Sequence, residues 1–166
     1  NEIQYAHEFL ADQMKRQIDS TGTGYMMRSK DFDAAGGMPA EYPNLIFSDY
    51  QLWISLMQLG YKATSSKKCF SYRLHQSVSK ITNGMAYQQA FLKYCDFLID
   101  LAKKDSKIQK IIALYGKEFL LYYCEAMSHR ILKTPITKRT IKVADFIRAC
   151  ESVAEKFIPG QVFEPL

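Results

Sequence analysis

The sequence predicts a helix-rich α/β protein, with a mixed front part followed by an antiparallel bundle of three helices. From about residue 84 to 158, apolar residues recur every three or four positions, as they do on one face of a helix. Before this stretch the pattern changes repeatedly, and short apolar runs alternate with glycine and proline. The 166 residues, 48% of them hydrophobic, are enough to fill a core. We therefore expect two domains, residues 1–82 and residues 83–166.

The first predicted helix covers residues 2–19. Five apolar side chains lie at helical spacing on one of its faces: Ile3, Ala6, Leu10, Met14 and Ile18. The glycines of STGTG, residues 20–24, end it. The apolar run YMMRS, residues 25–29, is short and bounded by turn residues, so we expect a buried strand there.

Residues 30–37, KDFDAAGG, predict one helical turn that stops at Gly36 and Gly37. Residues 38–47 contain two of the five prolines and predict a loop.

A second helix is predicted from Ser48, because Ser48 and Gln51 have the spacing of a capping box. Its apolar stripe comprises Leu52, Leu56 and Leu59, with Trp53 and Ile54 beside it. Gly60 is expected to end it in the left-handed conformation. Residues 61–66 and 67–75 are predicted strands, since alternating polarity in the second gives two unlike faces.

The back part predicts three helices joined by short turns, which favours antiparallel packing. Ser106 and Gln109 again have capping-box spacing. Gly116 indicates either a bend or a close-packing point in the second of these helices. Pro135 should end that helix, and Gly160 follows the last one.

Composition narrows the classes of function. The four cysteines form no C-x-x-C pair, so we interpret Cys69, Cys95, Cys124 and Cys150 as reduced thiols of a cytoplasmic protein, most of them buried. No segment has the apolar length of a membrane span, and no leader peptide is evident. The net charge of +5 favours anionic partners, but no basic run interleaved with aromatic residues indicates nucleic-acid binding.

Several separated motifs resemble the second half of the catalytic domain of family 2 nucleotide-sugar glycosyltransferases, which has the GT-A fold. After GYMMRS and the Gly36–Gly37 pair comes SDYQLWISLMQLGY, similar to the family's helix DxxLWxRLxxxGY. The strand ending YRLHQSVS, residues 72–79, is similar to the family's YRxHxxSxS. The resemblance covers about residues 20–80 and keeps the family's order of motifs.

Two departures qualify the resemblance. Ser48 stands where the family has an acid before the aspartate. We also find neither the family's N-terminal nucleotide-binding strand nor aspartates placed to hold a metal as its D-x-D motif does. The chain begins with Asn1 rather than Met, and we expect a C-terminal piece of such an enzyme, inactive in isolation.

The resemblance assigns Asp49 as the general base that takes the proton from the acceptor hydroxyl. At a helix start, the dipole favours an ionised carboxylate. Without the resemblance, the same position would indicate an aspartate that only stabilises the helix dipole.

The resemblance also implies roles for residues flanking this helix. Arg73 and His75 would bind the diphosphate, and His75 would approach a divalent Mg²⁺ or Mn²⁺, a cofactor expected only with the missing N-terminal half. Gly36, Gly37 and Met38 would lie beside the acceptor. The alternatives are a strand end that meets solvent and an ordinary helix C-cap.

These assignments predict part of an inverting glycosyltransferase of polysaccharide biosynthesis. Its partners would be a nucleotide-sugar donor and a glycan or lipid-linked acceptor, and it would be cytoplasmic, with peripheral contact at the inner face of the membrane. Two lysine-rich groups are either solvated faces or contacts to an anionic surface: Lys103, Lys104, Lys107 and Lys110, and Lys138, Arg139 and Lys142. The alternative function is a non-enzymatic helical module that binds a protein or an anionic membrane.

Overall fold

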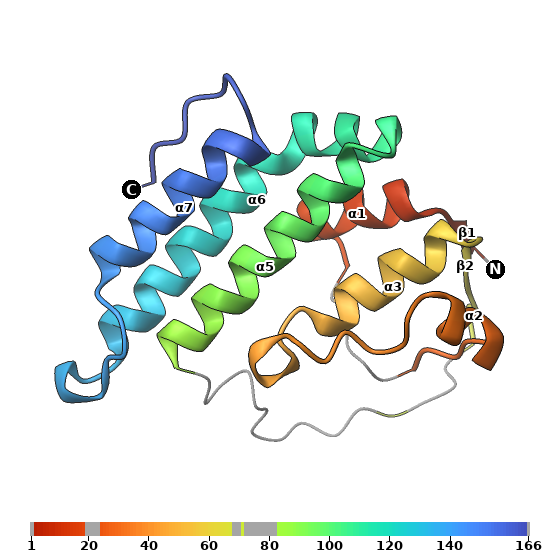
Figure 1. The fold of residues 1–166 in the computed structure, drawn as a ribbon, viewed down its shortest axis with the longest axis horizontal. Coiled ribbons are helices and arrows are strands. Elements are labelled where there is room, and N and C mark those ends of the chain that lie inside the picture. The colour runs from red at the N-terminus through yellow and green to blue at the C-terminus, as the bar shows by residue number, and fades with distance from the viewer. Residues whose placement is uncertain (1, 19–23, 68–70, 72–82, 166) are drawn as a thin grey trace.

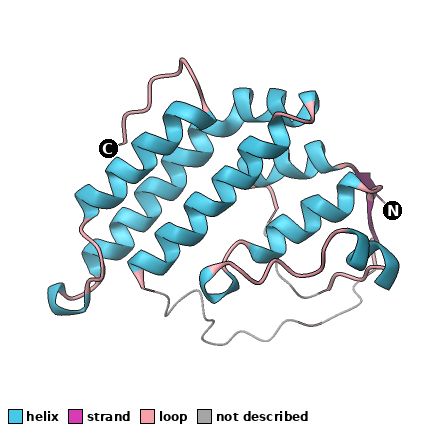
Figure 2. Ribbon diagram, viewed as in Figure 1, coloured by secondary structure: helices cyan, strands magenta, loops and turns pink. Residues whose placement is uncertain are grey.

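A computed structural model describes residues 2–18, 24–67, 71 and 83–165, and it is mostly helical. The elements in chain order are β1 Glu2–Gln4, α1 Ala6–Met14, α2 Ser29–Ala34, the 3₁₀ turn η1 Pro43–Leu45, α3 Ser48–Gln58, β2 Lys62–Thr64, α5 Gly84–Ala102, α6 Ser106–Lys133, the 3₁₀ turn η2 Ile136–Lys138 and α7 Val143–Phe157. Figure 2 shows how fully helices dominate the described chain. The helix-rich expectation is confirmed at this level.

Helices α5, α6 and α7 pack against one another and run in alternating directions (Figure 1). This confirms the predicted antiparallel bundle, and α6 ends before Pro135 as expected. Helix α1 packs along α6, and α3 packs on α1. The front helices therefore cover one side of the bundle.

The caps of the bundle helices differ in part from the prediction. Asp105, not Ser106, is the N-cap of α6, and its Oδ1 accepts a hydrogen bond of 2.9 Å from the backbone N–H of Lys107. A carboxylate one residue upstream has displaced the expected capping box. At the start of α5, Asn83 Oδ1 accepts a 2.9 Å bond from the N–H of Ala86.

Gly116 is a close-packing point. A β-carbon there would lie 2.9 Å from Cγ2 of Ile158 and 3.0 Å from Cε1 of Phe157. The end of α7 can approach α6 this closely only because position 116 carries no side chain.

The first predicted helix is wrong at both ends. Residues 2–4 form β1, which pairs antiparallel with β2 so that Gln4 lies opposite Lys62, and only α1 follows as helix. Ile3, expected on the buried face, is 58% exposed. The apolar spacing predicts a helix that includes Ile3. It misses the strand because the partner of β1, β2, lies about sixty residues away along the chain, beyond any local pattern.

Two further local predictions are wrong. Residues 25–28 form no strand, and the Met26 side chain is 99% exposed. Gly60 does not have a positive φ, since α3 ends through αR geometry at Leu59. By contrast, Gly36 and Gly37 have φ of 86° and 77° after α2, as predicted. The predicted strand over 61–66 corresponds to β2, whereas most of that predicted over 67–75 lies outside the described residues.

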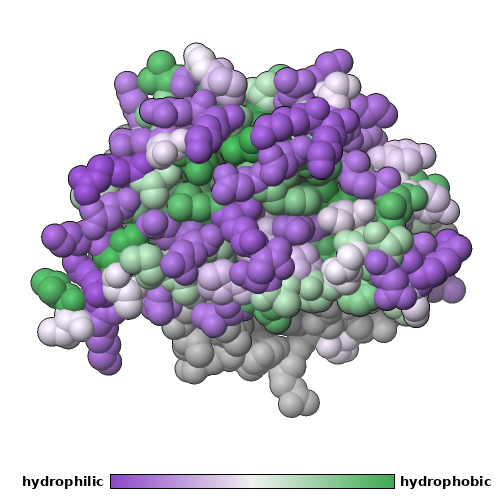
Figure 3. Space-filling view, in the orientation of Figure 1, coloured by the Kyte–Doolittle hydropathy of each residue, from purple (hydrophilic) through white to green (hydrophobic). Residues whose placement is uncertain are grey.

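One hydrophobic cluster runs through the described chain and includes side chains from α1, α3 and the bundle. Cys95, Cys124 and Cys150 are free and buried in it, as expected. Burial raises the pKa of the Cys95 thiol. The face seen in Figure 3 is largely hydrophilic. Among the described helices, none combines the length and the apolar character of a membrane span.

Candidate functional site

Asp49 lies in the first turn of α3, and it is half-buried. The N–H of Tyr50 lies 3.0 Å from its Oδ1. At this end of the helix the unpaired backbone N–H groups favour a negative charge. The structure therefore places a carboxylate where the helix stabilises its ionised form.

The residue before α3, Phe47, holds this helix start against the bundle. Its buried ring lies 5.2 Å from the ring of Tyr94 and 5.4 Å from that of Tyr123, measured between centroids. It also lies 5.7 Å from the ring of Tyr87 and 5.8 Å from that of Phe91. Its backbone has a φ of 66°, an unfavourable value for a bulky side chain. The contacts of the ring offset this strain and fix where α3 begins.

The predicted capping box at α3 is wrong, because Ser48 and Gln51 bond to the preceding loop instead. The hydroxyl of buried Ser48 donates a 2.5 Å hydrogen bond to the carbonyl oxygen of Pro39. Gln51 Oε1 accepts a bond from the hydroxyl of Tyr42, whose pKa is raised by its burial. These two bonds tie the loop to α3.

The end of the glycine loop is thereby bonded to the first residue of α3. Gly36, Gly37 and Met38 directly precede Pro39, which accepts the bond from Ser48, the neighbour of Asp49. Gly37 also packs on the ring of Phe32, since a β-carbon there would lie 3.6 Å from its Cε1. The bond therefore ties the residue that follows Met38 to the residue that precedes Asp49, and the roles of Asp49, Gly36, Gly37 and Met38 stay predictions. Arg73 and His75 lie outside the described residues, so their roles stay predictions.

The chain does contain one D-x-D sequence, Asp31–Phe32–Asp33, which the sequence expectation overlooked. It lies in α2, where residues two apart point to different sides. Asp31 faces the guanidinium of Arg28 at 3.8 Å. Within the described residues, no three histidine, cysteine, aspartate or glutamate side chains are grouped to hold a metal. The two carboxylates of this pair are therefore not placed to bind one metal ion together, as those of a metal-binding D-x-D motif are.

A groove of about 660 Å³ lies between residues 25–31 and the end of α3 with β2, and the sequence did not reveal it. Tyr25 stacks on Trp53 with a centroid distance of 4.1 Å. Trp53 is 6% exposed, and its indole N–H has no hydrogen-bond partner among the described residues. Met26 and Tyr61 add exposed apolar surface. Folding brings residues 25–31, the end of α3 and β2 together to form the groove. The spacing of residues along the chain therefore does not predict it.

No family model, curated protein or solved structure matches the chain.

Proposed function

We propose that this chain supplies the acceptor side of an inverting nucleotide-sugar glycosyltransferase, with Asp49 as general base. The observation that carries the proposal is the Ser48–Pro39 hydrogen bond, which ties the Asp49 helix start to the loop of Gly36, Gly37 and Met38. A sugar hydroxyl bound at that loop would lie beside a carboxylate kept ionised by the helix.

The rest of the reaction requires groups that stabilise the negative charge on the departing diphosphate. We assign Arg73 and His75 to the diphosphate, with His75 also near a divalent Mg²⁺ or Mn²⁺, on the strength of the sequence motif alone. Further aspartates for the metal and the nucleotide would come from residues outside this sequence. The acceptor would be a glycan or a lipid-linked sugar, and the location cytoplasmic.

The test replaces Asp49 with Asn in the natural polypeptide that carries this sequence. Loss of a positioned base should reduce turnover by about 10²–10⁴-fold while the affinity for the nucleotide-sugar donor is unchanged. The matched control is Asp145→Asn, another half-buried first-turn aspartate, in α7. Turnover of Asp49→Asn equal to that of the control would remove Asp49 from the base role.

A second assay tests whether the donor site lies outside these 166 residues. We expect the isolated 166-residue chain to neither hydrolyse nor transfer from nucleotide-sugar donors. Robust turnover by this chain would contradict that division of the site.

The competing proposal is a non-enzymatic interaction module. The observation that favours it is the exposed apolar surface of Met26 and Tyr61 on the 660 Å³ groove. Donor binding to the natural polypeptide distinguishes the two, because an interaction module has no need of a nucleotide-sugar site.

A further inference from the structure

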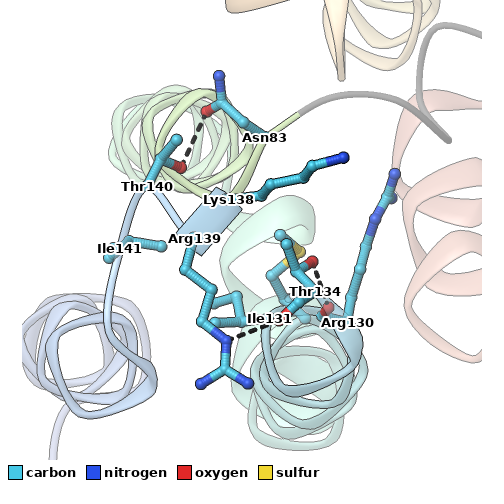
Figure 4. A pocket seen from close by; sticks show the side chains of 10 residues that line it. Asn83, Arg130, Ile131, Thr134, Lys138, Arg139, Thr140 and Ile141 are labelled. Atoms are coloured by element: carbon cyan, nitrogen blue, oxygen red, sulfur yellow. Dashed lines mark hydrogen bonds between the residues drawn. The ribbon is translucent and has the colours of Figure 1, made fainter. Parts of the chain in front are cut away.

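We propose that a second, separate hollow, at the end of the bundle where α5 begins and α6 ends, binds a phosphoryl group. The hollow has a volume of about 250 Å³ and lies against the α6–α7 connection (Figure 4). Its walls carry three cationic side chains, Arg130, Lys138 and Arg139, and the hydroxyl side chains of Thr134 and Thr140. None of the described residues lining it is an aspartate or glutamate.

The surrounding sequence concentrates positive charge. Residues 126–144 contain five lysine and arginine residues and no aspartate or glutamate, namely Arg130, Lys133, Lys138, Arg139 and Lys142. That local charge of +5 equals the net charge of the whole chain. A concave site of one sign attracts an ion of the opposite sign.

One of the three cations, Arg139, is bound to the end of α6. Arg139 donates from Nε to the carbonyl oxygen of Thr134 and from a terminal nitrogen to that of Leu132, both at 2.8 Å. It thereby caps helix carbonyls, as basic residues do at C-termini. In Figure 4 the side chains of Lys138 and Arg130 extend away from the bond between Arg139 and Thr134.

Lys138 has the least compensated charge at the hollow. The ion pairs and side-chain hydrogen bonds of the described residues do not include its ammonium group. The hydroxyl of Thr134 already donates to the carbonyl oxygen of Arg130, and that of Thr140 donates to Asn83 Oδ1. Lys138 is therefore the side chain at the hollow best suited to phosphate oxygens, which accept charge-assisted hydrogen bonds.

The first turn of α5 shapes the hollow but does not supply its donors. The N–H of Ala86 bonds to Asn83, and the N–H of Met85 donates to the hydroxyl of Thr140 at 3.1 Å. Gly84 lies so close to the connection that a β-carbon there would be 2.6 Å from Cγ2 of Ile141. These contacts hold the wall in place before a ligand arrives, which lowers the entropic cost of binding.

The size of the hollow limits the ligand to a small group. Pockets for drug-sized molecules occupy about 300–1,000 Å³, so 250 Å³ suits a phosphoryl group rather than a nucleotide. Two apolar side chains flank the same turn, Leu132 at 56% and Ile136 at 79% exposure. The phosphoryl group can therefore come from free phosphate or from a lipid headgroup.

The first experiment titrates the ¹⁵N-labelled 166-residue chain with inorganic phosphate. We expect saturable shifts of the amide signals around Gly84 and Lys138. Lys138→Gln should weaken binding about tenfold, the loss expected for one charge-assisted hydrogen bond. The matched control, Lys142→Gln, removes the same charge from an exposed residue outside the hollow and should change affinity less than about twofold.

The second experiment measures co-sedimentation with phosphatidylcholine vesicles, with or without phosphatidic acid. If phosphate saturates the site and the vesicles do not bind, the ligand is a soluble phosphate. If vesicles with phosphatidic acid bind and vesicles without it do not, and Lys138→Gln weakens vesicle binding more than Lys142→Gln does, the ligand is a lipid headgroup. Binding of neither probe, or equal losses in both variants, overturns the proposal.

Discussion

The bundle and the front part are held together in different ways. Helices α5, α6 and α7 bury long apolar faces against one another, and each face follows from local spacing. The front part consists of short elements held by contacts that no helical repeat reveals, such as β1 on β2 and Ser48 on Pro39 in the preceding loop. The candidate base Asp49 belongs to this less regular part.

Contacts between the two parts give the front its fixed position. The Phe47 ring lies among rings of α5 and α6, and the hydroxyl of buried Tyr94 in α5 donates a 2.6 Å bond to Gln13 Oε1 in α1. A front part built on such contacts depends on the bundle, whereas the bundle has most of its core within itself. Substitutions in the two parts should therefore differ in how far their effects on stability extend through the molecule.

The largest expected effect is that of Phe47→Ala. Loss of a buried aromatic ring should lower the free energy of unfolding by about 3–5 kcal/mol. We expect one cooperative transition at lower denaturant, with faster hydrogen exchange in α3 and α5 alike, because the ring contacts both parts.

The control is Phe163→Ala, a half-buried ring in the C-terminal tail, whose loss should cost less. If Phe47→Ala accelerates exchange in α3 while α5 is unchanged, the front part folds on its own and the comparison fails.

An intermediate effect is expected inside the bundle for Gly116→Ala. The added methyl group would crowd Ile158 and Phe157, at a cost of about 1–3 kcal/mol that exceeds the gain in helix propensity. Gly60→Ala is the matched change in the front part, where a β-carbon meets nothing within 4 Å, and it should be neutral or stabilising in thermal unfolding. Equal melting temperatures for the two variants would show that α6 and α7 can separate without cost.

The smallest effect tests the start of α6. Asp105→Ala removes the cap and should cost about 0.5–2 kcal/mol in denaturant unfolding, whereas Ser106→Ala should cost only a few tenths. The reverse order would restore the capping box that the sequence predicted.

The sequence predicts the fold best where a helix buries one apolar face. The bundle, the order of its helices and the end of α6 before Pro135 were predicted because apolar spacing of three and four needs no knowledge of partners. The failures at Ile3, Met26 and the Ser48 capping box share one cause. In each, surroundings that the local pattern does not contain outweighed the local preference: β2 beside Ile3, exposure to solvent at Met26, and Pro39 as the partner of Ser48.

The candidate site divides in the same way. The helix start at Asp49 and the turns at Gly36 and Gly37 were predictable from local residue types. The role of Phe47 was not, because an aromatic residue with positive φ gives no sequence signal. The hollow beside Lys138 likewise depends on three chain segments that meet only after folding.

The most direct test of Asp49 as general base is the pH dependence of kcat/KM for sugar transfer by the natural polypeptide. With the wild-type residue, the rate should fall at low pH as the base becomes protonated. Asp49→Asn should give a low rate that no longer shows this acidic limb. A variant that keeps both the wild-type rate and the acidic limb would contradict the proposed mechanism.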